Sequence, residues 1–230
     1  MTVFYIIIMS NARPLVQVAL DILSLDEALQ ITSVVAPYVD VIEVGTPLIK
    51  SEGIRSVSEL KKAHSDKLIC ADLKIADAGY LETKMAALAG ADIVTVLADA
   101  YDATIVETLR AAREFNVEIM ADLIMSRKPP VRLAEIVDLE YKETKLHYCE
   151  VHSGLDIQVS RYDPLTELAA VVNIQGHPKI AIAGGINKAD IPKLRAYPID
   201  IIIIGGAITR SKDPQSITRD IRKLVDSIFT

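Results

Sequence analysis

The sequence predicts a single-domain (β/α)8 (TIM) barrel, and two features of the chain lead to that fold class. Short apolar runs alternate with longer segments of helical periodicity over most of the 230 residues, a pattern typical of parallel strands covered by helices. The apolar residues are mainly Ile, Val, Leu and Ala, with 5% aromatic residues and no Trp. This composition suits strands that are buried on both faces.

Eight apolar runs are the expected strands, at residues 15–20, 39–44, 67–71, 92–97, 117–121, 146–151, 179–183 and 200–204. Helices are expected between them, among others at residues 26–36, 78–89, 103–115 and 214–228. A capping box at Ser24 and Glu27 marks one helix start, and Pro214 behind Asp213 marks another. The alternative is a doubly wound open sheet, which eight strands without a Gly-x-Gly-x-x-Gly fingerprint after the first one disfavour. The least regular connections are residues 126–130 and 141–145.

Composition also limits the class of protein. The formal net charge of −6 disfavours nucleic acid as a partner, because such proteins need a basic face. No apolar run reaches the roughly 18–20 residues that cross a bilayer, so we expect no membrane contact and a cytoplasmic location. Cys70 and Cys149 form no CxxC pair and are expected to be buried thiols of the core. Residues 1–14 are expected to be an N-terminal extension, with Met9 as an alternative start, and residues 15–230 the barrel.

Ionisable residues end five of the expected strands, and in a (β/α)8 barrel the chemistry lies at these carboxyl ends. They are Asp21, Glu43, Asp72, Asp122 and His152, and Lys74 and Asp77 follow shortly after Asp72. Carboxylates gathered at one mouth repel one another, and a hard divalent cation relieves that repulsion. We therefore predict that Glu43 and Asp72, on adjacent strands, bind Mg²⁺, with Mn²⁺ as an alternative. Helix capping or pairing with Lys74 are the other roles open to these acids.

Glycine pairs end the last two strands, at Gly184-Gly185 and Gly205-Gly206. A phosphate site is frequent after these strands of a barrel, and glycine lets backbone N–H groups approach phosphate oxygens. Tight turns also need glycine, but two pairs together favour a phosphate site, to which Thr209, Arg210 or Ser211 could add contacts. Asp21 and Thr46 are further candidates for substrate binding.

His152 is the histidine expected at the catalytic rim, where an imidazole can move protons near neutral pH. His64 and His177 lie in polar turns, and His147 begins its strand and belongs at the opposite end of the barrel. A purely structural histidine is the alternative reading of His152.

The stretch Asp72-Leu-Lys74-Ile-Ala-Asp77 resembles the Asp-x-Lys-x-x-Asp motif of the orotidine 5′-monophosphate decarboxylase suprafamily. Residues 18–21, 42–50, 151–156 and 183–185 resemble the corresponding segments of its 3-hexulose-6-phosphate synthase and 3-keto-L-gulonate-6-phosphate decarboxylase branch. The resemblance covers nearly the whole chain from Leu15 onward. Glu43 stands where the nucleotide decarboxylases carry a lysine, which disfavours that activity.

The resemblance favours the synthase over the gulonate decarboxylase. The decarboxylases share the stretch from Lys74 to Gly79, but they usually carry Glu, Arg and Arg where this chain has Asp122, Leu155 and Gly206. The arginine missing at Leu155 matters most, since it helps to deliver a proton after decarboxylation. The gulonate decarboxylase stays the alternative function.

The resemblance implies a Mg²⁺-dependent, reversible aldol addition of formaldehyde to D-ribulose 5-phosphate. In that scheme His152 removes a proton from C1, Lys74 and Mg²⁺ stabilise the enediolate, and Asp122 orients hydroxyls or relays a proton. Asp77 reaches the active site of a partner subunit, which implies a homodimer. Two other readings stay open: a catalytically silent barrel that binds sugar phosphates, and a ribulose-phosphate epimerase, which would need more metal-binding histidines.

Overall fold

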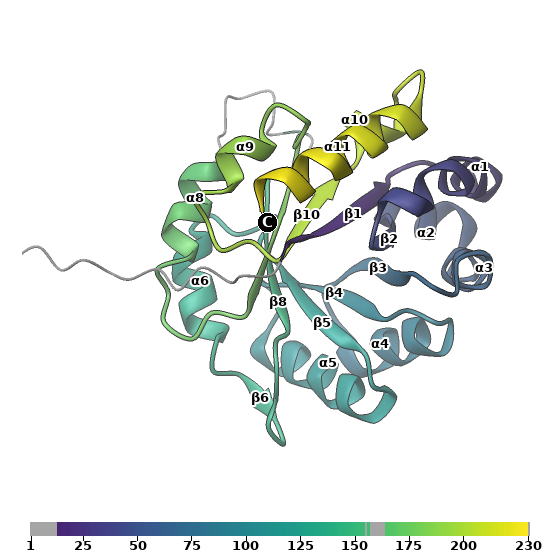
Figure 1. The fold of residues 1–230 in the computed structure, drawn as a ribbon. Coiled ribbons are helices and arrows are strands. Elements are labelled where there is room, and N and C mark those ends of the chain that lie inside the picture. The colour runs from purple at the N-terminus through teal and green to yellow at the C-terminus, as the bar shows by residue number, and fades with distance from the viewer. Residues whose placement is uncertain (1–12, 155, 157–163, 230) are drawn as a thin grey trace, which may run out of the picture.

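The computed structural model describes residues 13–154, 156 and 164–229, so residues 1–12 of the predicted extension lie outside the described residues. Eight parallel strands close into a barrel in the order β1-β10-β9-β8-β5-β4-β3-β2, and helices surround it (Figure 1). The predicted single-domain (β/α)8 barrel is confirmed. The barrel strands are β1 Leu15–Leu20, β2 Val41–Val44, β3 Leu68–Ile75, β4 Ile93–Leu97, β5 Glu118–Asp122, β8 Tyr148–His152, β9 Lys179–Ala183 and β10 Ile201–Ile204.

The α-helices described are α1 Leu25–Val35, α2 Thr46–Glu52, α3 Arg55–Ala63, α4 Gly79–Leu88, α5 Asp102–Phe115, α6 Pro129–Ile136, α8 Pro164–Val171, α9 Ile191–Leu194, α10 Gly206–Thr209 and α11 Pro214–Ile228. A 3₁₀ turn, Ala36–Tyr38, follows α1. The Ser24 hydroxyl accepts a hydrogen bond from the Glu27 N–H, so the predicted cap of α1 is present. The Asp213 carboxylate likewise caps α11 by accepting from the Ser216 N–H at 2.9 Å.

Side chains alternate along each barrel strand, which gives the protein two apolar layers. On β1, Val16, Val18 and Leu20 face outward and pack under the helices. Ala19 faces inward, into a cluster that fills the barrel together with Val41, Cys70, Ile93, Met120, Tyr148, Ala181, Ala183, Ile201 and Ile203. Cys70 and Cys149 are buried free thiols, as predicted. The cluster that fills the barrel is thus largely apolar, and the ionisable residues predicted for the site lie beyond it, toward the end where the strands finish.

Two boundaries differ from the predicted ones where a turn or bulge intervenes. β2 begins at Val41 rather than at residue 39, because Val39 ends the 3₁₀ turn, its N–H donating to the Ala36 carbonyl. β3 runs on to Ile75, so Asp72 and Lys74 belong to the strand rather than to the loop after it.

The irregular stretch at residues 141–145 belongs to a small antiparallel hairpin, β6 Glu140–Tyr141 and β7 Thr144–Lys145. It projects from the barrel beside α5 (Figure 1), and the Arg113 guanidinium on α5 donates to the Lys142 carbonyl. In the described part of the chain, no helix has the length and apolar character needed to span a membrane.

Candidate active site

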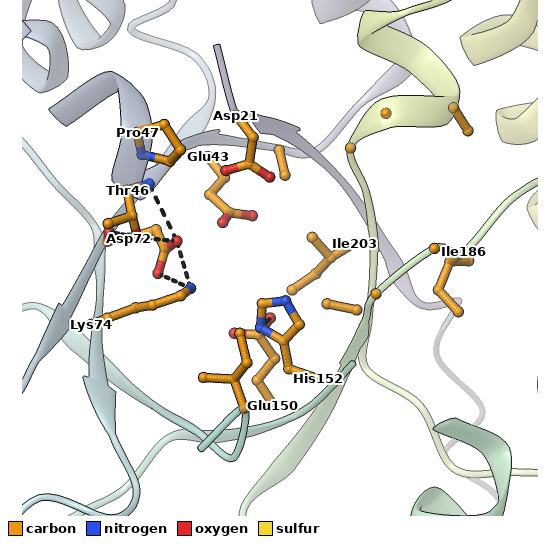
Figure 2. A pocket seen from close by; sticks show the side chains of 18 of the residues that line it. Asp21, Glu43, Thr46, Pro47, Asp72, Lys74, Glu150, His152, Ile186 and Ile203 are labelled. Atoms are coloured by element: carbon orange, nitrogen blue, oxygen red, sulfur yellow. Dashed lines mark hydrogen bonds and ion pairs between the residues drawn. The ribbon is translucent and has the colours of Figure 1, made fainter. Parts of the chain in front are cut away.

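A cavity of about 530 Å³ opens at the carboxyl ends of the barrel strands. Most residues predicted for the site line it (Figure 2): Asp21, Glu43, Thr46, Asp72, Lys74, His152, Gly184, Gly185, Gly205 and Gly206. Glu150 and Arg210 line it too. Asp122 does not line the cavity, because its side chain is fully buried. Asp77 is exposed and lies outside the cavity of its own chain. Leu155 lies outside the described residues.

Asp72 is the best-anchored carboxylate of the cavity, and its side chain is only 3% exposed. One oxygen, Oδ1, accepts from the Thr95 hydroxyl at 2.8 Å and from the Lys74 ammonium at 2.9 Å. The other, Oδ2, accepts from the Thr46 hydroxyl and the same ammonium, each at 2.7 Å (Figure 2). A fifth, longer hydrogen bond comes from the Thr46 N–H to Oδ2 at 3.4 Å, and together these bonds fix the carboxylate in one orientation.

Lys74 sits at a bulge that turns its side chain into the cavity. The pairing of β3 with β4 shifts register between Ala71 and Ile75, and Lys74 has a φ of 47°. For a residue other than glycine, this left-handed backbone conformation costs roughly 1 kcal/mol or more of free energy. Such backbone strain is common at functional sites. The backbone is held there by a hydrogen bond from the Lys74 N–H to the Thr95 hydroxyl at 2.9 Å.

The Lys74 ammonium lies between two carboxylates, 2.7 Å from Asp72 and 3.0 Å from Asp122. Burial by itself would lower the pKa of Lys74, but Asp122 and Asp72 outweigh it, so the pKa is raised above its ordinary value. The side chain therefore presents a permanent positive charge to the cavity.

His152 faces two carboxylates through a single ring nitrogen. Its Nδ1 lies 3.2 Å from Asp122 Oδ2 and 3.0 Å from Glu150 Oε1. Burial would lower the pKa of His152, but Glu150 and Asp122 raise it well above its ordinary value. In return, His152 and Lys74 outweigh burial at Asp122 and lower the pKa of that carboxyl. The charges of Lys74, Asp122 and His152 therefore support one another.

Glu43 is the carboxylate that this array leaves without a cation. It is 6% exposed, and the contact that the structure gives it is a hydrogen bond from the Gln17 side-chain amide at 2.6 Å. Within the described chain no lysine, arginine or histidine lies within ion-pair distance of it. Burial first, and then Asp72, Glu150 and Asp21, raise the pKa of Glu43 well above its ordinary value. The position calls for a cation that the protein does not itself supply.

The opposite side of the cavity is formed by glycine and one arginine. Gly184 has a φ of 99°, and a Cβ there would collide with Ser153, so the loop requires glycine. The Arg210 guanidinium lines the cavity and fills the space that a side chain on Gly206 would need. Desolvation and Asp72 raise the pKa of Asp21, while Lys74, His152 and Arg210 act against this shift. Of the predicted phosphate contacts Thr209, Arg210 and Ser211, only Arg210 lines the cavity.

The three other histidines lie where the sequence predicts. His64 and His177 are partly exposed, and neither lines the cavity. His147 lies at the start of β8, at the opposite end of the barrel, where its Nδ1 accepts from the Ile119 N–H at 3.0 Å.

A metal ion could be held by Asp122, Glu150 and His152, which offer ligand atoms within 4.8 Å of one another. In the structure these atoms contact each other, and the Lys74 ammonium already touches Asp122. Glu43 and Asp72 also line the cavity (Figure 2), and Glu43 has no ion-pair partner among the described residues.

Sequence reasoning missed Glu150, Gln17 and Thr95. Glu150 lies inside the apolar run of β8, and the signal that could have found it is its place two residues before His152. In a strand that spacing puts both side chains on the same face. Gln17 and Thr95 are likewise polar residues at inward positions of otherwise apolar strands.

Because its pKa is raised, Glu43 makes the stability of the metal-free protein depend on pH. The folded protein binds this proton more tightly than the unfolded chain, so stability is lost as pH rises from the ordinary pKa of 4.5 through the folded value. We expect Glu43→Gln to flatten the fall between about pH 5 and pH 8 and to be more stable than the unmodified protein at pH 8.

Urea unfolding in EDTA at both pH values measures this effect, with the exposed Glu59→Gln as control. A variant that loses as much stability as the unmodified protein between the two pH values would show that Glu43 is not the group that titrates.

Comparison with known proteins agrees with this geometry. A curated relative, the 3-hexulose-6-phosphate synthase of Mycobacterium gastri, is 39% identical over 91% of this chain and 98% of its own. The solved 3-hexulose-6-phosphate synthase of Salmonella typhimurium has a TM-score of 0.86 and 33% identity, covering 93% of this chain and 99% of its own. The solved 3-keto-L-gulonate-6-phosphate decarboxylase of Vibrio cholerae has a TM-score of 0.79 and 29% identity, covering 94% and 99%.

A sequence model of one family spans almost the whole barrel. It is described as the orotidine 5′-phosphate decarboxylase / HUMPS family and matches residues 14–221. With the barrel, the cavity and these relatives in agreement, the chain belongs to the orotidine 5′-phosphate decarboxylase / HUMPS family.

Proposed function

We propose that the protein is a 3-hexulose-6-phosphate synthase, a lyase that adds formaldehyde to D-ribulose 5-phosphate in a reversible aldol reaction. The observation that carries the proposal is one cavity with two different ends: the array of Asp72, Lys74 and His152 faces a wall of glycine and Arg210. The identity with curated synthases over 91% of the chain supports it.

The glycine wall suits the phosphate of the substrate. Gly184, Gly185, Gly205 and Gly206 expose backbone N–H groups without obstructing Cβ atoms, and Arg210 adds a positive charge. With the phosphate at this end, the sugar extends across the cavity toward Lys74 and His152, and Asp21 and Thr46 lie within its reach.

At the other end, the chain supplies a base and a fixed positive charge. The neutral form of His152, which prevails above the raised pKa of the ring, removes a proton from C1 of ribulose 5-phosphate through its cavity-facing nitrogen. Lys74 stabilises the negative charge of the enediolate, an effect often worth several kcal/mol. The C1 carbon then bonds to the carbon of formaldehyde, and the formaldehyde oxygen takes up the proton that His152 carries. Asp122, fully buried beneath them, holds Lys74 and His152 in place.

The residues present fit a Mg²⁺ ion, and Glu43 and Asp72 would hold it. Carboxylate oxygens are the donors that Mg²⁺ prefers, and Glu43 is a buried carboxylate that forms no ion pair with any cation of the described chain. When bound, the ion polarises substrate oxygens as a Lewis acid. Mn²⁺ satisfies the same donor set and stays an alternative.

The gulonate-phosphate decarboxylase is the second candidate, because a decarboxylase shares the fold at 29% identity. Gly206 distinguishes the two candidates: the resemblance gives the decarboxylases an arginine at this position, whereas here the Arg210 guanidinium lies against Gly206.

We further propose that the protein forms a homodimer through α4. Leu81, Met85 and Leu88 lie on one face of this helix, at spacings of four and three residues, and are 65%, 41% and 70% exposed. Asp77, just before α4, is exposed and turned away from its own cavity, so it is free to reach a second copy.

Sedimentation equilibrium should give about twice the chain mass of 25.1 kDa. The double variant Leu81→Glu, Leu88→Glu should sediment as a monomer with an intact circular dichroism spectrum. A monomeric unmodified protein, or a variant that still forms dimers, would contradict the proposed interface.

We place this activity in the cytoplasm, since both cysteines are buried free thiols and none is paired in a disulfide.

Consumption of formaldehyde tests the proposed activity. Purified protein with Mg²⁺ should consume formaldehyde only when ribulose 5-phosphate is present, and EDTA should stop the reaction. Binding of ribulose 5-phosphate without any consumption would instead favour a silent sugar-phosphate-binding barrel.

A further inference from the structure

Glu150 has no part in the mechanism above, yet it lines the cavity beside His152. It sits in β8 two residues before His152, so both side chains point into the barrel. Its side chain is 4% exposed and lies directly below the His152 ring (Figure 2). A buried acid in an apolar strand is costly unless a partner compensates it, so its presence needs an explanation.

The partner of Glu150 is the same ring nitrogen that Asp122 contacts. Nδ1 of His152 lies 3.0 Å from Glu150 Oε1 and 3.2 Å from Asp122 Oδ2. The two carboxylates come from different strands, β8 and β5, and so hold the ring from two directions. Asp122 is also shared, because it accepts from Lys74 at 3.0 Å and from the Ile124 N–H at 2.9 Å.

Two acceptors at one nitrogen determine which nitrogen exchanges protons. Burial and Asp122 raise the pKa of Glu150, whereas His152 and Lys74 favour its ionised form. The pKa of Asp122 is lowered, so Asp122 is an ionised carboxylate that can only accept, and the Nδ1 nitrogen that faces it carries hydrogen. Nδ1 therefore keeps its proton in the neutral ring and in the charged ring. The lone pair of the neutral ring is left on Nε2, on the side of the ring away from both carboxylates.

We propose that Glu150 is a positioning residue that, together with Asp122, keeps His152 in the Nδ1-protonated form with Nε2 presented to the substrate. The catalytic meaning of this arrangement rests on the proposed function, whereas the arrangement itself does not. Asp122 alone would have to serve both Lys74 and His152. Glu150 provides a second acceptor at Nδ1, so the ring does not depend on the carboxylate that also holds Lys74.

Nitrogen-15 spectra of the histidine rings test the proposal without any substrate, because the shift distinguishes a protonated ring nitrogen from a bare one. The His152 signals are assigned by their loss in His152→Gln. In the unmodified protein Nδ1 should be protonated at every pH at which the fold persists. In Glu150→Gln, which keeps the shape of the side chain, a fraction with bare Nδ1 should appear in alkaline buffer.

Glu118→Gln is the matched control, since Glu118 accepts from the Tyr148 hydroxyl at 3.0 Å at the other end of the barrel. Its His152 spectrum should equal that of the unmodified protein. A bare Nδ1 in the unmodified protein, or a Glu150→Gln spectrum identical to it, would overturn the proposal; the first result needs no variant to fold.

Two further measurements separate positioning from other roles. In Glu150→Gln, kcat for exchange of the C1 proton of ribulose 5-phosphate should fall about tenfold or more, with KM within about twofold. Mg²⁺ affinity, measured by calorimetry, should stay unchanged. A tenfold loss of Mg²⁺ affinity would make Glu150 a metal ligand and overturn the positioning role. If the protein consumes no formaldehyde but the spectra behave as expected, the proposed function fails and the role of Glu150 stands.

Discussion

Replacing Asp72 with asparagine is expected to abolish metal-dependent turnover, a loss of about 10³-fold or more, while the barrel stays folded. Both oxygens of Asp72 accept hydrogen bonds, and the Lys74 ammonium contacts both of them. An amide offers one acceptor in place of two, turns a donor toward the ammonium or a threonine hydroxyl, and removes the charge that a cation needs. The variant therefore loses the anchor of Lys74 and one proposed Mg²⁺ ligand at once.

Turnover of ribulose 5-phosphate with formaldehyde over a range of Mg²⁺ concentrations measures this loss, and circular dichroism checks the fold. Asp213→Asn is a suitable control, because Asp213 caps α11 far from the chemistry and asparagine caps helices equally well. Unchanged activity in Asp72→Asn would remove Asp72 from the proposed metal site.

Replacing His152 with alanine should slow exchange of the C1 proton of ribulose 5-phosphate by about 10²–10⁴-fold. The ring is 18% exposed, lines the cavity and is held at Nδ1 by Asp122 and Glu150. Alanine removes the base and leaves the two carboxylates facing each other. Phosphate binding at the glycine wall should change little, so the loss should appear in kcat rather than in KM.

Uptake of deuterium from solvent at C1, followed by proton NMR, measures this exchange directly. His64→Ala is the matched control, because His64 follows α3 and does not line the cavity. Normal exchange in His152→Ala would assign the base to another group.

The sequence predicts the fold well because the barrel depends on a local and repeated pattern. Each apolar run becomes a strand, and a charged or glycine residue at its carboxyl end falls on the same rim as the others. This rule places Asp21, Glu43, Asp72, His152 and both glycine pairs at one cavity without any knowledge of contacts.

What the sequence does not predict depends on register and on backbone distortion. The bulge at Lys74 lengthens β3 and gives a lysine a left-handed backbone, and neither follows from apolar periodicity. The burial of Asp122 depends on strand register, because Asp122 pairs with Glu150 of β8 rather than with His152 at the strand's end. Glu150 does not stand out in the sequence because it lies within an apolar run. Its role becomes apparent only when the structure shows that its side chain points into the barrel.

A paired assay tests the central claim most directly: one protein sample with Mg²⁺ is given ribulose 5-phosphate plus formaldehyde, or 3-keto-L-gulonate 6-phosphate. Loss of formaldehyde and release of CO₂ are followed, each with and without EDTA, and the two kcat/KM values are compared. We expect faster formaldehyde consumption that EDTA abolishes. Faster CO₂ release would contradict the account and assign the cavity to a decarboxylase.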